Sequence, residues 1–216
     1  MNQPFPAPLV EAQLAENWDA AWAGLGRPPP TGLRQELERA WAEPQRHYHD
    51  LRHLGECLAL WSRWHRHCER PAEVAIALWF HDAVYDTQAS DNELNSAAWA
   101  ARSLSGSRLA SDVARRVHDL VMATRHDAPA EGPDAELLVD IDLAILGSPP
   151  ERFEAYDRDV RKEYAWVPNS LYRRKRLDVL RGFADRPQLY HCQPAVDLLE
   201  TQARLNLANA ISRLTE

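Results

Sequence analysis

Histidine followed directly by aspartate occurs at four places in this sequence, and one of the pairs lies where a charge is costly. His81 and Asp82 close the run VAIALWF, which is apolar on every face of a helix. A buried carboxylate in such a place must be paired or bound to a metal ion. The other pairs begin at His49, His118 and His126. Of these, His118 lies on an amphipathic segment that can face water, so His81 and Asp82 are the strongest candidates for chemistry.

Further histidines and aspartates can complete a metal site. His49 and His53 are four residues apart, a spacing that places both on the same side of one helix. Asp142 lies on the apolar stripe of its segment, where an unpaired charge is costly, whereas Asp140 points to another side. The expected ligands are His53, His81, Asp82 and Asp142, with His49 open as an alternative to His53 and Asp140 to Asp142. Two imidazoles and two carboxylates suit a divalent ion such as Mn, Fe, Mg, Co, Ni or Zn.

Helices must position these side chains, because apolar spacing is helical nearly everywhere and no segment alternates with a period of two. Prolines, glycines and capping residues divide the pattern into about eight to ten helices. The expected helices are 14–25, 31–41, 47–67, 71–82, 90–106, 109–124, 133–147, 150–167, 170–184 and 195–215. The sequence therefore predicts an all-α protein.

A chain of 216 residues is long enough for one sizeable core, and its composition does not suggest a second domain. Within this single domain we expect N-terminal helices over 1–45, the helices of the metal site over 46–147, and C-terminal helices packing on them over 148–216. Three scattered cysteines without a Cys-x-x-Cys motif indicate neither a disulfide framework nor a zinc–thiolate site.

The formal net charge of −7 argues against a nucleic-acid polymer or a membrane surface as the main partner. The first residues lack the basic start and apolar stretch of a signal peptide, and no run approaches the length of a membrane span. The expected location is therefore the cytoplasm.

Several motifs recur in an order that resembles a known superfamily. They are YHDLRHL, ALWFHDAVYD, DNELNSA, MATRHD, DIDLAILG, RKEYAWVP and ETQARLNL, within roughly residues 41–210. With His53, His81-Asp82 and Asp142 in this order, the chain is similar to the HD superfamily of metal-dependent phosphohydrolases. It most resembles a bacterial subgroup of predicted HD phosphohydrolases of unknown substrate. The resemblance implies an HD-domain-like helical bundle in which His53, His81, Asp82 and Asp142 bind the metal.

The activity implied is hydrolysis of a phosphoester by a metal-activated water, with a nucleotide as the expected substrate class. Asp82 belongs to the expected catalytic residues. The reaction also needs a cation for the phosphate and an acid for the leaving oxygen. Arg125 and His126 are the candidates for phosphate contact, and Glu93 is the candidate for the acid or for a residue that holds the ion's water.

Each of these helpers has a simpler explanation. Arg125 and His126 follow a helix, where cations are favoured by the helix dipole. Glu93 can form a capping box with Ser90 at the start of a helix. The basic run 173–175, which could reach a nucleotide phosphate, is typical of an exposed helix face. A second metal ion would need a further histidine ligand. Only His126, and less so His118, is placed to supply it.

Two other functions stay open on the same residues. One is a di-iron HD-type oxygenase, which two bound irons and a visible absorption band would indicate. The other is a non-catalytic metal-supported module that binds a nucleotide without turnover. The expected partner is a small-molecule phosphoester or nucleotide, and a homodimer is an open alternative to a monomer.

Overall fold

The computed structural model describes residues 5–107 and 109–216, and over these residues it is helical with no β-strand. The α-helices are α1 (Glu11–Gly24), α2 (Leu33–Trp41), α3 (Leu51–Trp64), α4 (Pro71–Phe80), α5 (Asn92–Gly106), α6 (Ser111–Met122), α7 (Pro133–Asp142), α8 (Pro150–Glu163), α9 (Asn169–Ala184), α10 (Gln193–Ala195) and α11 (Thr201–Thr215). The predicted all-α fold is confirmed. Within the same ranges, no helix has the length and apolar character needed to cross a membrane.

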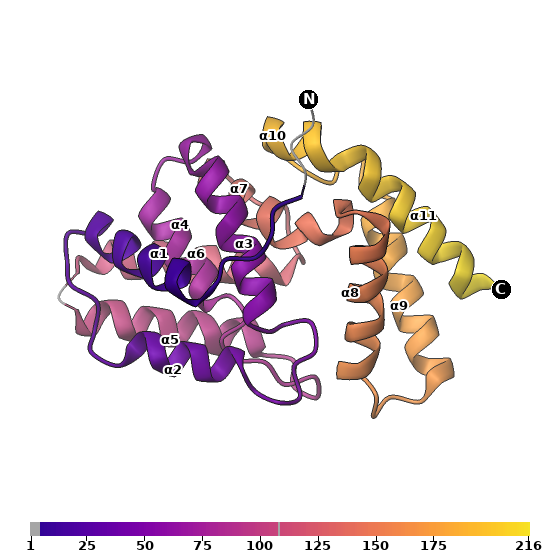
Figure 1. Ribbon diagram of the computed structural model, residues 1–216, viewed down its shortest axis with the longest axis horizontal. Coiled ribbons are helices and arrows are strands. Elements are labelled where there is room, and N and C mark those ends of the chain that lie inside the picture. Colours follow the sequence, from indigo (N-terminus) through magenta and orange to yellow (C-terminus); the bar gives the residue numbers. More distant parts are fainter. Residues whose placement is uncertain (1–4, 108) are drawn as a thin grey trace.

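Helix α4 lies at the centre of the N-terminal helices. It packs against α1, α3, α5, α6 and α7, and its residues from Val74 to Phe80 are fully buried. This position explains why the segment is apolar on every face, since each side meets another helix. Figure 1 shows these helices gathered in one body, with α8, α9 and α11 beside it.

Polar contacts fasten the C-terminal helices to this body. Arg152 of α8 donates to both carboxylate oxygens of Glu56 on α3, at 2.7 and 2.6 Å. Asn206 of α11 donates through Nδ2 to the carbonyl oxygens of Leu146 and Ser148, each at 2.8 Å. These groups are buried or nearly so, which makes the loss of either partner costly. Buried apolar side chains from α1 to α11 form one cluster around these contacts.

Helix α3 begins later than the sequence predicted. The Asp50 side chain accepts hydrogen bonds from the backbone N–H groups of Arg52 at 2.9 Å and His53 at 3.2 Å, so Asp50 is the N-cap. His49 therefore precedes the helix and lies in a loop. The prediction that His49 and His53 project from one helix is wrong.

The predicted capping box at the start of α5 is also wrong. Helix α5 begins at Asn92, and its N-cap Asp91 makes no side-chain capping bond. The Asn92 amide instead accepts from the backbone N–H of Asp86 at 3.0 Å and donates to its carbonyl oxygen at 2.9 Å. The start of α5 is thus fixed by two hydrogen bonds to the loop after His81-Asp82 rather than by a capping box within the helix.

The helix predicted over 133–147 changes its character after Asp142. Leu143–Gly147 form a 3-10 turn, which packs against a π-helical turn at Val196–Glu200. A Cβ atom on Gly147 would lie 2.6 Å from both Cβ and the carbonyl oxygen of Leu199. Only glycine permits this close approach, because the obstructing atoms include rigid backbone.

Replacing Gly147 with alanine should lower the free energy of unfolding by about 1–3 kcal/mol, the usual cost of overpacking. Gly182→Ala is the control, because no atom lies within 4 Å of a Cβ at this position in α9. Urea denaturation of metal-free protein measures both changes. Equal stability of the two variants would contradict the packing described for Gly147.

Candidate metal centre

Three helix ends that are far apart in the sequence bring the expected ligands to one place. His53 lies in the first turn of α3, His81 and Asp82 follow α4, and Asp142 is the last residue of α7. One nitrogen or oxygen atom from each of these side chains lies within 4.8 Å of those of the others. The structure therefore assembles the side chains that the sequence indicated as a metal-binding set.

The separations between the ligand atoms suit a single ion. His53 Nε2 lies 3.2 Å from His81 Nε2 and 3.3 Å from Asp142 Oδ1. Asp82 Oδ2 lies 3.4 Å from His81 Nε2 and 4.0 Å from His53 Nε2. With metal–ligand bonds of about 2.1 Å, two ligand atoms stand about 3.0 Å apart at a right angle and about 4.2 Å apart across the ion. These separations fall between the two limits, so a divalent ion fits the set.

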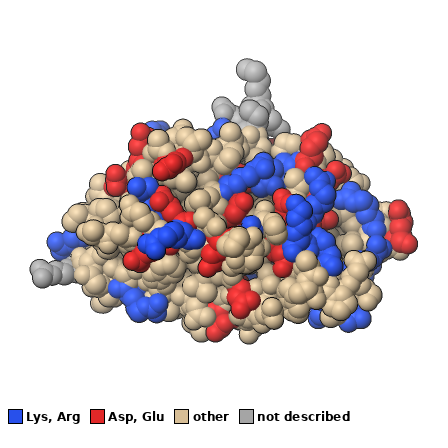
Figure 2. Space-filling model, turned by 60° about the horizontal axis from the view of Figure 1, so that its bottom comes forward, with Lys and Arg blue, Asp and Glu red and all other residues tan. Residues whose placement is uncertain are grey.

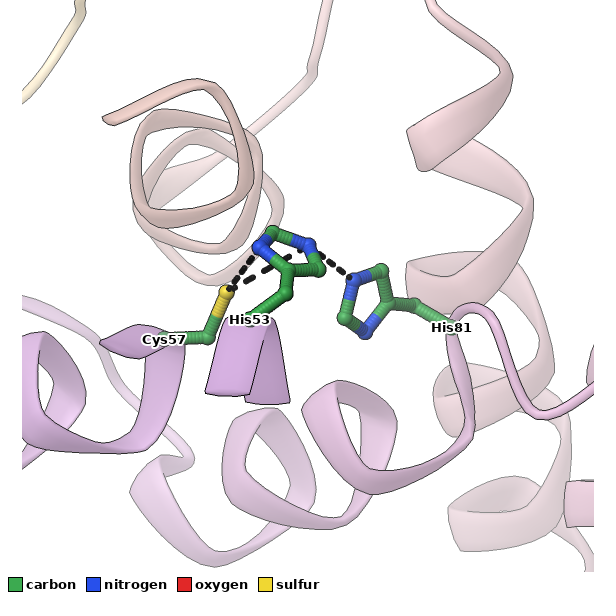
Figure 3. A group of neighbouring side chains, drawn as sticks. All are labelled: His53, Cys57 and His81. Atoms are coloured by element: carbon green, nitrogen blue, oxygen red, sulfur yellow. Dashed lines mark hydrogen bonds between the residues drawn. The ribbon is translucent and has the colours of Figure 1, made fainter. Parts of the chain in front are cut away.

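The imidazole of His81 is oriented by its own helix. Its Nδ1 lies 2.7 Å from the carbonyl oxygen of Leu78, which can only accept, so Nδ1 carries the hydrogen. The lone pair of Nε2 is then available on the side of His53. Figure 3 shows the two rings turned towards each other, one from α3 and one from the end of α4. Facing imidazole nitrogens need a proton or a metal ion between them, because two lone pairs at this distance repel.

Cys57 offers a sulfur atom to the same histidines. Its Sγ lies 3.7 Å from His53 Nδ1 and 3.8 Å from His53 Nε2, so it rests against the ring (Figure 3). His53, Cys57 and His81 thus form a second group with metal-ligand spacing. Burial raises the pKa of the Cys57 thiol well above its usual range, and a neutral thiol is a poor ligand. The set with two carboxylates complements a divalent ion better.

Burial differs between the two kinds of ligand. His53 and His81 are 3% and 1% exposed, whereas the Asp82 and Asp142 side chains are 16% and 14% exposed. Burial would raise the pKa of Asp142, but its contacts with His126 and the two ligand imidazoles lower it well below its usual range. Burial would lower the pKa of His81, but Asp82 and Asp142 raise it to about 9. The cluster is thus open to solvent on its carboxylate side, and an ion that binds must displace a proton.

His126 touches the cluster from outside the ligand set. Its Nε2 lies 3.0 Å from Asp142 Oδ2, while Asp142 Oδ1 faces His53 and His81. The backbone of His126 has φ 56°, in the left-handed region. That conformation costs a non-glycine residue about 1–2 kcal/mol, so the surrounding structure must hold it. The sequence indicated His126 as a phosphate contact or as a ligand of a second ion. In the structure its Nε2 contacts Asp142, so His126 is in a position to orient this carboxylate.

The alternative ligands have other partners. Asp140 is fully buried and accepts the backbone N–H groups of His191 at 2.8 Å and Cys192 at 2.6 Å. It therefore fixes the loop before α10. His49 Nδ1 lies 2.7 Å from Glu163 Oε2. In the part of the chain that the structure describes, neither Asp140 nor His49 belongs to a group with metal-ligand spacing.

Glu163, whose role cannot be read from the sequence, ties α8 to two loops at the cluster. Its Oε1 accepts the backbone N–H groups of His47, Tyr48 and His49 at 2.8, 2.7 and 2.9 Å. Its Oε2 accepts Nδ1–H of His49 at 2.7 Å and the hydroxyl of Tyr85 at 2.8 Å. Burial would raise the pKa of Glu163, but the bonds to His49 and to backbone N–H groups lower it to about 2. This carboxylate is therefore ionised whenever the protein is folded near neutral pH.

Arg46 is a second residue that the sequence gave no reason to select. It is buried, and its guanidinium donates to the carbonyl oxygens of Asp82 at 2.6 Å, Ala83 at 3.0 Å and His49 at 3.1 Å. It thereby fixes the backbone turn that carries Asp82. A single arginine in a polar segment shows no sign of burial in sequence, so only the structure could identify it.

Among the described residues, the other candidates make no contact with the ligands. Arg125 is 45% exposed and pairs with Asp127 at 3.2 Å, and Glu93 lies half-buried in the first turn of α5. The contacts of the described residues bring neither side chain to the cluster, so their predicted roles gain no support from the geometry. His118 pairs with its neighbour Asp119 on the surface of α6. Figure 2 shows basic side chains gathered on the side of the molecule where Figure 1 places α9, the helix of the run 173–175.

Comparison of the chain with known protein families, with characterised proteins and with solved structures finds no match. The resemblance to the HD superfamily therefore stays a prediction from the sequence motifs. What is established at this point is a helical fold with a buried group of histidine and aspartate side chains that could hold a metal ion.

His126→Ala should weaken metal binding about 10- to 100-fold without abolishing it, because His126 orients Asp142 and is not itself a ligand. Competition with a chromophoric chelator measures the affinity. His118→Ala, which removes the exposed histidine of another His-Asp pair, should leave it unchanged. An unaltered affinity in His126→Ala, or a complete loss of stoichiometric binding, would each refute the supporting role.

Glu163 should control the acid stability of the metal-free protein. Its folded pKa of about 2 is below its usual value of 4.5, so its contribution is present above pH 4.5 and is lost as the pH falls towards 2. The shift corresponds to about 3 kcal/mol. Glu163→Gln should therefore flatten the fall in unfolding free energy across this range, measured by urea denaturation. Glu154→Gln, an exposed glutamate of α8, should keep the wild-type slope, and the same slope in both variants would refute the assignment.

Proposed function

We propose that this chain is a metal-dependent phosphohydrolase that cleaves a phosphoester, with a nucleotide as the substrate class. The observation that carries the proposal is the convergence of His53, His81, Asp82 and Asp142 within 4.8 Å. A mixed nitrogen and oxygen set of this kind binds divalent ions that activate water. The resemblance of the motifs to HD phosphohydrolases points to the same reaction.

When bound, a divalent ion would make a water acidic enough to act as hydroxide near neutral pH and would polarise a phosphoryl oxygen. The chain's own residues prepare this chemistry. His53 and His81 are buried, which fixes their rings, and the charges of Asp82 and Asp142 offset the charge of the ion. Asp82 also borders solvent, with 16% of its side chain exposed, and this supports a role for it in hydrogen-bonding the attacking water.

A pocket beside the His81-Asp82 turn supports a nucleotide as substrate. Its volume of about 790 Å³ lies within the range of small-molecule sites, about 300–1,000 Å³. Tyr85, three residues after Asp82, lines the pocket together with Trp99 and Trp166. Trp166 is 54% exposed, although a large aromatic ring gains from burial. The exposed ring of Trp166 at such a site suits the stacking of a nucleobase.

Protein purified without chelators or nickel affinity should contain one divalent ion per chain and hydrolyse members of a panel of nucleotides and other phosphoesters. Asp82→Ala should lose the ion, and its activity should fall by more than about 100-fold. This fall exceeds the one expected when a residue that only orients a ligand is replaced. Asp119→Ala is the matched control, because it alters an exposed His-Asp pair on α6. Metal analysis and phosphate release measure both effects.

Other results would exclude the proposal in distinct ways. Two irons per chain with a visible absorption band would identify an oxygenase. Tight nucleotide binding without turnover under any of the candidate metals would identify a binding module. Full metal content in Asp82→Ala would remove Asp82 from the ligands and with it the proposed arrangement.

A further inference from the structure

A second pocket is formed by two loops of the chain and is separate from the four proposed ligands. Residues 126–130, before α7, line one side of it, and residues 186–188 with His191, after α9, line the other. Its volume of about 380 Å³ lies within the range of small-molecule sites, about 300–1,000 Å³. The pocket can therefore hold a small molecule.

Arg186 brings a positive charge into this pocket that no acid of the described residues balances. Its side chain is half-buried, and burial lowers its pKa, although an arginine stays protonated in a protein. Within the described ranges, Arg186 forms no ion pair with a carboxylate. Asp127 also lines the pocket, but it pairs with Arg125 at 3.2 Å. A bound anion would therefore offset the charge of Arg186.

The guanidinium of Arg186 is held in place while most of its N–H groups stay available. Its central carbon lies over the ring of Phe183, 4.8 Å from the centroid. Its Nη2 donates to the carbonyl oxygen of His126 at 3.5 Å, and its own carbonyl oxygen accepts from Arg204 at 2.8 Å. A guanidinium has five N–H groups in one plane, and their arrangement matches the oxygens of a phosphate or a carboxylate. Arg186 is thus oriented to bind an oxyanion.

His191 and Gln188 supply further polar atoms to the same pocket. Nδ1 of His191 lies 3.0 Å from Asp140 Oδ1, and the amide nitrogen of Gln188 donates to the carbonyl oxygen of Tyr190 at 2.6 Å. These contacts fix both side chains. Among the described residues, Nε2 of His191 and the side-chain oxygen of Gln188 have no partner. Both atoms are therefore available to the uncharged part of a ligand.

We propose that this pocket binds a small oxyanion and that Arg186 binds the charged group of that ligand. The ligand class is a small molecule with a phosphate or a carboxylate group, and the rest of the molecule contacts His191 and Gln188. None of the four proposed metal ligands lines the pocket. The site therefore depends neither on a bound metal ion nor on the proposed hydrolysis.

Inorganic phosphate and acetate are the probes, and their binding to the full chain as purified is measured by calorimetry. The wild type should bind one anion per chain at this site, and the probe with the higher affinity identifies the charged group of the ligand. Arg186→Gln removes the charge and should bind that anion about tenfold more weakly, the effect of losing a charged hydrogen bond. Arg174→Gln is the matched control, because Arg174 is exposed on α9, and it should bind the anion normally.

Arg186→Lys distinguishes binding from a structural role of the side chain. It keeps the positive charge but lacks the planar set of donors, so it should recover part of the affinity that Arg186→Gln loses. Melting temperatures are measured in parallel, and the lysine variant decides the question if the glutamine variant does not fold. A purely structural role would lower the melting temperature and leave the anion affinity of the folded variants unchanged.

Treatment with a chelator separates this pocket from the metal centre. Since the pocket contains no proposed metal ligand, the affinity that depends on Arg186 should be the same before and after the treatment. Loss of this binding with the metal would place the anion at the metal centre and overturn the proposal.

Three further results would overturn it: no binding of either anion by the wild type at millimolar concentrations, wild-type affinity in both Arg186 variants, or an equal loss of affinity in Arg174→Gln and Arg186→Gln. The last result would mean that the anion binds to the basic surface in general. None of these measurements depends on turnover. A chain that binds the anion through Arg186 but hydrolyses no ester would refute the proposed enzyme and leave this site standing.

Discussion

The meeting of two imidazoles and two carboxylates at one point is the constraint on which the surrounding structure depends. Carboxylates that are mostly buried are stable only when protons or a cation balance them. Helices α3, α4 and α7 each deliver a ligand from an end rather than from the middle. Backbone groups near helix ends lack partners within the helix. One of them, the carbonyl oxygen of Leu78, accepts a hydrogen bond from His81 Nδ1–H and thereby orients the ring. The central position of α4 then fixes where the ligands meet.

A second layer of polar contacts holds this arrangement from outside. Arg46 fixes the turn of Asp82, His126 engages the outer oxygen of Asp142, and Glu163 fastens the loop before α3. These partners belong to different parts of the chain, and Glu163 comes from the C-terminal helices. The C-terminal part therefore contributes to the site, although it supplies none of the four ligands.

Local patterns were sufficient to predict the all-α fold and the histidines and aspartates that the structure brings within 4.8 Å of one another, because apolar spacing and the His-Asp pair are properties of short segments. They failed where a residue's partner is distant. Glu163 and His49 are separated by 114 positions, and no spacing rule links them. Asp140 and Asp142 both have buried surroundings, and only the loop at His191 decides which one is free for a metal. The start of α3 was readable, since Asp50 precedes the apolar stripe, but the histidine spacing suggested a longer helix.

The most direct test of the central claim is anomalous diffraction from crystals of the protein soaked with Mn²⁺. We expect one anomalous peak per chain, about 2.0–2.3 Å from Nε2 of His53 and His81 and from carboxylate oxygens of Asp82 and Asp142. At saturating Mn²⁺, a peak only at exposed carboxylates elsewhere, or no peak among these four side chains, would contradict the account.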